Sequence, residues 1–503
     1  MSKLLVVGMG PLLDQGVRHF GGQCLRTWHF VKPLLEDGHT VRLVTLPVFD
    51  PDDTERDKAA LVRRGYEGFE YQAFTNCDFE FVHHTLANVV LSLVPDALIA
   101  VNNLPAWVSA RLPACMPLWA DLNGYEMAEK QGQAARTGDD SPLMEAWRRE
   151  SLVCRRADKF STVSRPQLHA LLGELAFVGR LNQHTFHYHF VHHFPNAYHS
   201  AFAQPPDENA PPILRGPVTP PDAFVLLWSG GYNYWTDPRF LFEFLEVTLA
   251  ASPLIHFVST GGAIHGYNTQ TYAEFQRLVQ ESPHRERYHL LGWVPAEDLP
   301  RIYHEADLGL NVDEPNYETF FGARNRLNNL MAAGVPVLTT YGSEISRTID
   351  EARCGLVCPP GDVAGLAHAV MSMVQAPEQR AKLSERARAF ALEEFAPGRL
   401  TVPMRDWARR PLLAPDNAVK LRSHPDAVRF LDHATNLVEE TAAVIDEHDV
   451  LALRKAQIDL DAIRSKGWYS TLKAAKDRLR CGADLAMRLA RKLKRSDRGA
   501  PRS

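Results

Sequence analysis

The sequence contains few cysteines, and none of them are paired. Its 503 residues include seven cysteines, and no two have the Cys-x-x-Cys spacing used by structural zinc sites and redox motifs. The nearest two, Cys354 and Cys358, have no histidine beside them. This argues against a zinc module or a disulfide scaffold and favours reduced thiols in a cytoplasmic protein.

Long hydrophobic runs and a large net charge are also missing. No stretch reaches the length needed to cross a membrane, and the apolar start MSKLLVVGMG is too short for a signal peptide. A net charge of −5 predicts no nucleic-acid partner. With 45% hydrophobic and 23% charged residues, the chain has the composition of a globular protein, and its length suits two domains with additions.

A dinucleotide fingerprint is absent, although the chain opens in the way that precedes one. An apolar strand at 4–7, a glycine-containing loop, a helix from Gly21 and Gly22 to Leu35, and a strand at 41–46 predict a Rossmann-like α/β unit. The loop has Gly10 but no Gly-x-Gly-x-x-Gly. We expect Gly10, Gly21 and Gly22 to contact an acceptor or donor phosphates across a cleft, and a purely structural turn is the alternative.

Two further short apolar stretches, at 97–101 and 117–121, predict strands of the same sheet. Asp121 ends the second, and ligands of open α/β sheets bind beyond the carboxyl ends of strands, so Asp121 is expected at the cleft.

No metal site is expected. The Asp50-x-Asp52 pattern lies in a polar linker, and the histidines that follow have no standard zinc spacing; they are residues 184, 187, 189, 192 and 193.

Seven prolines between residues 204 and 221 predict a linker, because proline interrupts helices and strands alike. The strand–helix alternation then resumes, with strands expected at 224–228, 256–259, 288–291, 308–311 and 337–340. Glycine-containing turns follow several of them and suit close approach of a phosphate. The candidate donor-binding residues in these turns are Gly230, Gly231, Thr260, Gly261, Trp293 and Gly342.

The stretch ETFFGARNRLNNLMAAGVP, residues 318–336, is the strongest functional signal. It runs from a loop into a helix that starts with two arginines, Arg324 and Arg326. Free N–H groups at a helix start together with two guanidinium groups suit a phosphorylated ligand. Glu318 is placed to accept hydrogen bonds from sugar or ribose hydroxyls. A surface loop with solvated or ion-paired arginines is the alternative.

This stretch resembles a branch of the glycosyltransferase family 4 (group 1) enzymes, which have the GT-B fold. The resemblance rests on Glu318-Thr319, Arg324-x-Arg326 and the turn Gly334-Val335-Pro336. The chain departs from the family where Asn329 replaces an acidic residue, and the commoner signature of two glutamates separated by seven residues is absent. Weaker similarity covers the segments around Asp121, 161–182 and 229–238.

The resemblance implies an α/β protein with two Rossmann-like domains facing a cleft. The expected organisation is an acceptor domain at 1–203, the linker at 204–221, a donor domain at 222–395, a cross-over helix at 396–415 and a helical tail at 416–503. It implies a retaining, metal-independent transfer of sugar from a nucleotide diphosphate sugar to a glycan or lipid-linked acceptor, with no cofactor. The implied catalytic residues are Glu318, Arg324, Arg326 and Asp121, and Asn329 is expected in place of the missing carboxylate.

The carboxyl-terminal tail has a different composition. Between Arg464 and Arg502 there are 13 Lys/Arg and 3 Asp/Glu, a local charge of +10. Apolar residues recur there every three or four positions, which predicts a basic amphipathic helix. We expect residues 464–498 to bind an anionic membrane, on the inner face of the plasma membrane; packing on the acidic remainder of the chain or a coiled coil is the alternative.

Two other functions fit the same fold. A sugar-nucleotide epimerase would need a carboxylate–histidine set in the cleft, and the motifs do not supply one. A catalytically silent scaffold would explain why the family's glutamates are missing.

Overall fold

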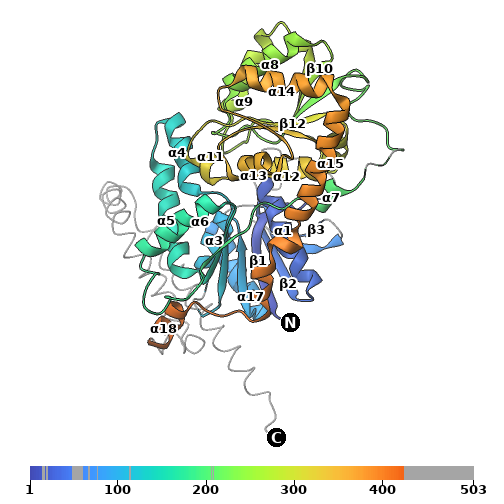
Figure 1. The fold of residues 1–503 in the computed structure, drawn as a ribbon. Helices are drawn as coiled ribbons and strands as arrows, with labels where there is room; N and C mark the ends of the chain where they lie inside the picture. The colour runs from blue at the N-terminus through green and yellow to red at the C-terminus, as the bar shows by residue number, and fades with distance from the viewer. Residues whose placement is uncertain are drawn as a thin grey trace, which may run out of the picture.

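The computed structural model describes residues 1–13, 17, 21–47, 60–65, 68–75, 78–112, 115–205, 207 and 209–423. Two α/β bodies lie one above the other, with the amino-terminal one below in Figure 1. The Asp50-x-Asp52 pattern and the tail beyond residue 423 lie outside the described residues. Within the described part of the chain, no helix is long and apolar enough to span a membrane.

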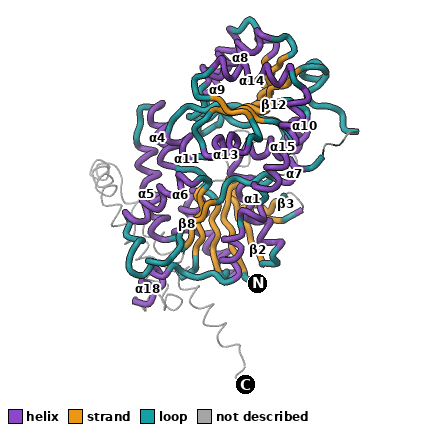
Figure 2. The backbone as a smooth tube through the Cα atoms, in the orientation of Figure 1, coloured by secondary structure: helices purple, strands orange, loops and turns teal. Residues whose placement is uncertain are grey.

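The amino-terminal domain is built on an eight-stranded sheet in the order β3-β4-β2-β1-β5-β6-β7-β8. All neighbours are parallel except β3 and β4. The strands are β1 (Lys3–Gly10), β2 (Thr40–Pro47), β3 (Ala60–Arg64), β4 (Glu70–Phe74), β5 (Ala97–Val101), β6 (Leu118–Leu122), β7 (Lys159–Thr162) and β8 (Val191–His193). Figure 2 shows the strands of this sheet between helical layers. Central strands are fully buried, as parallel sheets covered on both faces require.

The helices of this domain are α1 (Gly22–Glu36), α2 (Phe79–Leu93), α3 (Asn103–Ala110), α4 (Glu126–Thr137), α5 (Ser141–Arg156), α6 (Arg165–Phe177) and α7 (Ser200–Ala203). Helix α4 rises from the lower domain alongside the upper one (Figure 1). It contacts the upper domain through Arg136, which donates to Glu314 at 2.5 Å and to the Tyr234 carbonyl at 3.2 Å. One wall of the cleft between the domains is therefore a helix of the amino-terminal domain.

The second domain has a six-stranded parallel sheet in the order β11-β10-β9-β12-β13-β14. Its strands are β9 (Phe224–Ser229), β10 (Ile255–Thr260), β11 (Tyr288–Gly292), β12 (Leu308–Asn311), β13 (Val337–Thr340) and β14 (Leu356–Cys358). Its helices are α8 (Pro238–Ala251), α9 (Gln270–Glu281), α10 (Leu299–His304), α11 (Tyr317–Phe321), α12 (Asn325–Ala332), α13 (Glu344–Ala352), α14 (Val363–Gln375) and α15 (Pro377–Glu394), with 3₁₀ turns η2 (Arg285–Arg287) and η3 (Ala296–Asp298).

After α15 the chain returns to the first domain through α16 (Pro397–Leu400), α17 (Val402–Arg409) and α18 (Pro415–Ser423). Met404 and Trp407 of α17 pack with buried residues of the amino-terminal sheet. Arg405 donates to Asp37 at 2.8 Å, and Arg180 to Asp416 at 2.6 Å. These contacts attach the segment that follows the second domain to the first.

The predicted α/β class with two Rossmann-like domains is confirmed. Elements that the sequence pattern did not predict include the β3–β4 hairpin, strands β7, β8 and β14, and the α4–α5 pair. Helix α4 is largely polar, with only Ala128 and Ala134 buried, so its sequence lacks a continuous apolar stripe. The stretch 318–336 covers most of α11 and all of α12, with Arg324 at the junction between the two helices.

Candidate active site

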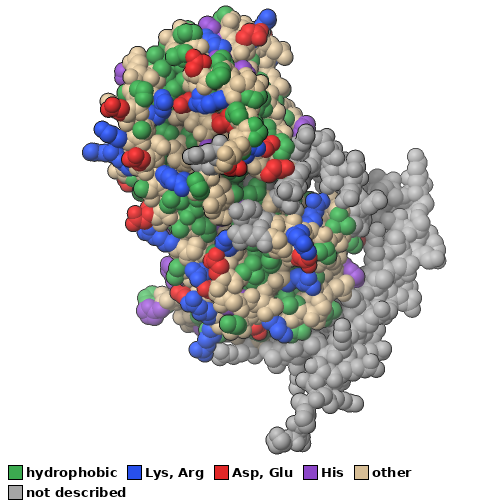
Figure 3. Space-filling view, turned by 90° about the vertical axis from the view of Figure 1, so that its right-hand side faces the viewer, with side chains coloured by type: hydrophobic (Ala, Val, Ile, Leu, Met, Phe, Trp, Pro, Cys, Tyr) green, Lys and Arg blue, Asp and Glu red, His purple; other side chains and the backbone are tan. Residues whose placement is uncertain are grey.

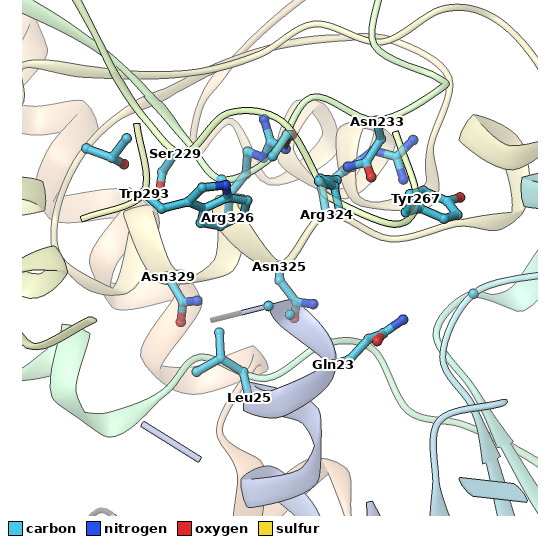
Figure 4. Close-up of a pocket in the computed structure, with 18 of the residues that line it drawn as sticks. Gln23, Leu25, Ser229, Asn233, Tyr267, Trp293, Arg324, Asn325, Arg326 and Asn329 are labelled. Atoms are coloured by element: carbon cyan, nitrogen blue, oxygen red, sulfur yellow. Dashed lines mark hydrogen bonds between the residues drawn. The ribbon is translucent and has the colours of Figure 1, made fainter. Parts of the chain in front are cut away.

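A cavity of about 450 Å³ lies between the two domains. Figure 4 shows the amino end of α1 pointing into it from below, opposite a row formed by Trp293, Arg326, Arg324 and Tyr267. The first domain contributes the start of α1, the loop after β6 and one residue of α4, whereas the second contributes the turns after β9, β10 and β11 and the starts of α11 and α12. The cavity therefore lies where the carboxyl ends of strands from both sheets meet.

Eleven of the predicted site residues line this cavity: Gly21, Gly22, Gly230, Gly231, Thr260, Gly261, Trp293, Glu318, Arg324, Arg326 and Asn329. The first and last of these residues, Gly21 and Asn329, are more than 300 positions apart in the sequence. Gly22 brings the two sides close together, since a Cβ there would lie 2.2 Å from the side-chain nitrogen of Asn325. The start of α1 thus packs directly on the start of α12.

Arg324 is fully engaged by acidic groups of its own domain. Its Nη1 and Nη2 donate to the two carboxylate oxygens of Glu318 at 3.0 and 2.7 Å, and its Nε donates to Asp313 at 2.6 Å. All three residues are buried. Burial disfavours the charged guanidinium, but Asp313 and Glu318 outweigh it and raise the Arg324 pKa. Arg324 therefore sets the position of Glu318 at the cavity wall.

Arg326, two residues along, is not neutralised in this way. Its Nη2 donates to the Gly231 carbonyl at 3.3 Å, and its guanidinium lies 4.2 Å from the centre of the Trp228 ring. Its Nη1 is buried and has no hydrogen-bond partner among the described residues. Burial lowers the pKa of this guanidinium, with Asp313 acting in the opposite direction. The cavity thus holds a cation with unused hydrogen-bonding capacity.

Two glycine turns form the upper wall. Gly230 and Gly261 have φ angles of 101° and 118°, and a Cβ on Gly261 would lie 2.4 Å from the Gly230 oxygen. Both positions require glycine for conformation and for space. The Gly230 and Gly261 N–H groups donate to the Thr260 and Gly292 carbonyls, each at 2.6 Å. The N–H of the next residue, Gly231, makes no hydrogen bond to a described residue.

Hydrogen bonds hold two other predicted donor-binding residues, Trp293 and Asn329, in place. The Trp293 indole N–H donates to the Ala263 carbonyl at 2.8 Å, which holds the ring at the cavity. The Asn329 side-chain oxygen accepts the His199 N–H at 2.9 Å, a contact between α12 and the segment leading to α7. Of the aromatic residues after Gly231, Tyr232 is buried in the core, while Trp235 lines the cavity beneath the Arg324 guanidinium.

Three predicted site residues do not line the cavity: Asp121, Gly10 and Gly342. Asp121 is fully buried below it, where it accepts from Arg26 Nη2 at 2.7 Å, from Arg26 Nε at 3.0 Å and from Ser161 at 2.6 Å. These bonds tie β6 to α1 and β7. Gly10 packs on Thr45 at the end of β1, and the Gly342 N–H donates to Ser346.

Two further residues, Glu129 and Tyr267, line the same cavity and were not predicted from the sequence. Glu129 lies in the first turn of α4, a helix that the sequence pattern did not predict. Tyr267 lies in the loop between β10 and α9. Neither residue belongs to a recognisable motif, so only the packing of the two domains brings them together.

Among the described residues, no group of three or more His, Cys, Asp or Glu side chains is arranged to hold a metal ion. Of the clustered histidines, His192 stacks on Trp119 with ring centres 5.1 Å apart. His193 lies 3.2 Å from Glu344 of the second domain. On the face shown in Figure 3, basic and acidic side chains of the described residues are interspersed.

Comparison with known proteins finds a family model that matches most of the second domain. A family described as "Glycosyl transferases group 1" matches residues 223–376. No curated protein is found as a relative of the chain. The matched region contains most of the cavity residues of the second domain.

Solved structures similar to the chain share its two-domain fold. Sucrose-phosphate synthase from Thermosynechococcus elongatus is 18% identical with a TM-score of 0.59, over 82% of this chain and 99% of that one. Anabaena HepE in complex with UDP-glucose is 15% identical, with a TM-score of 0.55 over 81% and 99%. An α,α-trehalose-phosphate synthase (UDP-forming) from Burkholderia vietnamiensis is 13% identical, with a TM-score of 0.56 over 81% and 99%.

Proposed function

We propose that this chain, a group 1 glycosyltransferase with the GT-B fold, transfers a sugar from a UDP-sugar to a hydroxyl of a glycan or lipid-linked acceptor. The uridine base is suggested by the printed ligands and activity of two similar structures, one bound to UDP-glucose and one UDP-forming. We further propose that the reaction retains the anomeric configuration and needs no metal ion.

The observation that carries the proposal is the state of Arg326. Its guanidinium lies at the cavity with Nη1 unpartnered among the described residues, whereas Arg324 beside it is neutralised by two carboxylates. A buried cation without a counter-ion is unfavourable unless a ligand supplies the charge. A diphosphate provides two or more negative charges and several acceptor oxygens, which suits a guanidinium.

Two helix starts add to this field. Helix α1 begins at the cavity with no side-chain cap and no acidic residue in its first turn, and the same is true of α12. Uncapped amino ends carry free N–H groups and a partial positive charge. The Gly231 N–H is a further donor on the same wall. These groups favour a diphosphate bound in the cavity, beside the starts of α1 and α12.

The proposed reaction follows from that placement. The bond between the sugar C1 and the diphosphate oxygen breaks, a bond from C1 to the acceptor oxygen forms, and the acceptor proton leaves with the departing diphosphate. Arg326 stabilises the charge that develops on the leaving group. Glu318, held by Arg324, accepts hydrogen bonds from the donor sugar or ribose, and Asn329 takes the place of the family's carboxylate.

A panel of nucleotides tests this function. Thermal shifts are measured with UDP, GDP, ADP and their common sugars, on wild type, Arg326→Ala and the control Arg277→Ala, whose guanidinium is exposed on α9 and paired with Glu281. We expect one nucleotide to stabilise the wild type and the control but not Arg326→Ala. No stabilisation by any nucleotide would overturn the proposal and favour a silent scaffold.

A further inference from the structure

We propose that Glu129 and Tyr267, one from each domain, bind hydroxyl groups of the donor sugar in the cavity. This inference rests on the proposed function and extends it by assigning the sugar-binding part of the site. It also indicates the class of sugar. The carboxyl groups of Glu129 and Glu318 and the phenol of Tyr267 suit a neutral, hydroxyl-rich sugar ring better than an anionic one.

Glu129 reaches the cavity from the first domain. It lies in the first turn of α4, and its Oε1 would be 2.5 Å from a Cβ on Gly124, which places the carboxyl against the loop after β6. That loop is held by Gln167, whose side-chain nitrogen donates to the Leu122 and Gly124 carbonyls at 3.0 and 2.7 Å. Glu129 is the one ionisable side chain that the described residues of the first domain contribute to the cavity lining.

Tyr267 reaches the same cavity from the second domain. The loop that carries it is closed by the Tyr267 N–H and the Asn268 N–H, which donate to the Ile264 carbonyl at 3.0 and 2.7 Å. The Tyr234 hydroxyl donates to the Tyr267 carbonyl, and the two rings lie 5.1 Å apart. The Tyr267 hydroxyl itself is buried and has no hydrogen-bond partner among the described residues. A buried hydroxyl left without a partner costs free energy that a ligand would recover.

Other contacts place Glu129 and Tyr267 at the same end of the cavity. Lys130, next to Glu129 on α4, lies with its Nζ 5.2 Å from the centre of the Tyr267 ring. Burial raises the Tyr267 pKa, and nearby Glu129 and then Glu318 raise it further, both of which line the same cavity. Glu318 is the carboxylate expected to hold the donor sugar, so a ring bound there has Glu129 and Tyr267 beside it.

The charged groups around Glu129 come from several elements. Glu318 of α11 and Glu126 of α4 disfavour its ionisation, while Lys130 of α4 and Arg324 favour it; Glu150 of α5 and Tyr267 also face it. Burial is the largest effect and, with the two glutamates, raises the Glu129 pKa to about 8. At neutral pH the carboxyl is then mostly protonated, so it both donates and accepts hydrogen bonds, as a sugar hydroxyl requires.

The experiment separates sugar binding from nucleotide binding. Isothermal titration measures Kd for UDP and for UDP-glucose, or for whichever nucleotide and its sugars bind, on Glu129→Ala, Glu129→Gln and Tyr267→Phe. We expect the UDP affinity to stay within about twofold of wild type, while UDP-glucose binds about 5- to 10-fold more weakly to Glu129→Ala and Tyr267→Phe. Glu129→Gln keeps most of the affinity, because the amide also donates and accepts.

Two control variants accompany the experiment, and its outcomes separate a failure of this inference from a failure of the proposed function. Glu145→Gln and Tyr317→Phe remove the same groups at exposed positions and are expected to change neither affinity. Melting temperatures verify that each variant is folded. An unchanged ratio of UDP to UDP-glucose affinity in folded Glu129→Ala and Tyr267→Phe would overturn this inference and leave the proposed function standing. Failure of the wild type to bind any nucleotide would overturn both.

Discussion

The Arg324 guanidinium donates to both carboxylate oxygens of Glu318, at 3.0 and 2.7 Å, and the side chains of the two residues are 3% and 5% exposed. In such a pair, removal of one partner leaves an uncompensated buried charge. The pair therefore holds the start of α11 and the start of α12 in fixed positions at the cavity, and its first consequence is for stability.

Arg324→Met is expected to lower the free energy of unfolding by about 3–5 kcal/mol, because both Glu318 and Asp313 lose their partner. Chemical denaturation measures the loss. The control is Arg277→Ala, which breaks an exposed pair with Glu281 and should cost no more than about 1 kcal/mol. Equal effects of the two variants would contradict the view that the Arg324 network stabilises the domain.

Asp121→Asn distinguishes a structural residue from a catalytic one. Asp121 neutralises Arg26 inside the domain, so we expect a loss of about 3 kcal/mol in stability, with kcat of the folded fraction within about threefold of wild type. Denaturation and steady-state kinetics on the same preparation check this. A fall in kcat of about 100-fold with unchanged stability would instead make Asp121 a catalytic residue.

Gly261→Ala is expected to weaken nucleotide binding and destabilise the second domain. The new Cβ would lie 2.4 Å from the Gly230 oxygen, in a backbone conformation with φ 118°. Gly173→Ala is the matched control, because Gly173 lies inside α6 with no atom within 4 Å of the added Cβ. That variant should gain about 0.5–1 kcal/mol from helix propensity. Melting temperature and nucleotide affinity, measured for both variants, test the contrast.

Two histidines, buried His199 and half-buried His192, predict that stability falls as the pH drops below about 6.5. Burial lowers the pKa of His192 and His199 to about 3, with His189 and Lys159 adding to the effect on His192. Between about pH 3 and 6.5 the unfolded chain binds more protons than the folded one, so stability rises with pH in that window and levels off above it. His192→Phe keeps the stacking on Trp119 and should reduce the slope by up to about 1.4 kcal/mol per pH unit. An unchanged slope in urea titrations at several pH values would contradict this assignment.

The basic segment 464–498 predicts binding of the full chain to anionic vesicles. Co-sedimentation with phosphatidylserine-containing vesicles should exceed that with neutral vesicles and decline with salt, since exposed charges are screened. Replacing Arg491, Lys492, Lys494 and Arg495 by glutamine is expected to abolish the difference. Binding that is equal for neutral and anionic vesicles would exclude an electrostatic membrane contact.

Much of the fold was predictable because its strands are short apolar runs between turn residues. Strands β5, β12 and β13 occupy the predicted ranges, since each is fully buried and bounded by polar or glycine-containing turns. Strand β14 and the β3–β4 hairpin were missed because their residues are partly exposed and lack that contrast. Helix α4 was missed because only Ala128 and Ala134 of it are buried, which leaves no continuous apolar stripe in its sequence.

By itself, the amino-acid sequence determined two parallel-sheet domains and a helix start with Arg324 and Arg326 at a ligand site, because these depend on neighbouring residues. The tertiary structure decided what each arginine does. Asp313 and Glu318 neutralise Arg324, while Arg326 keeps an unpartnered nitrogen among the described residues. It also placed Asp121 with Arg26 and brought Glu129 to Tyr267. Asp313 and Glu318 are close to both arginines in the sequence, and only the folded backbone decides that their carboxylates meet Arg324. The partner of Asp121 is 95 positions away, so the use of its charge follows from packing and not from local spacing.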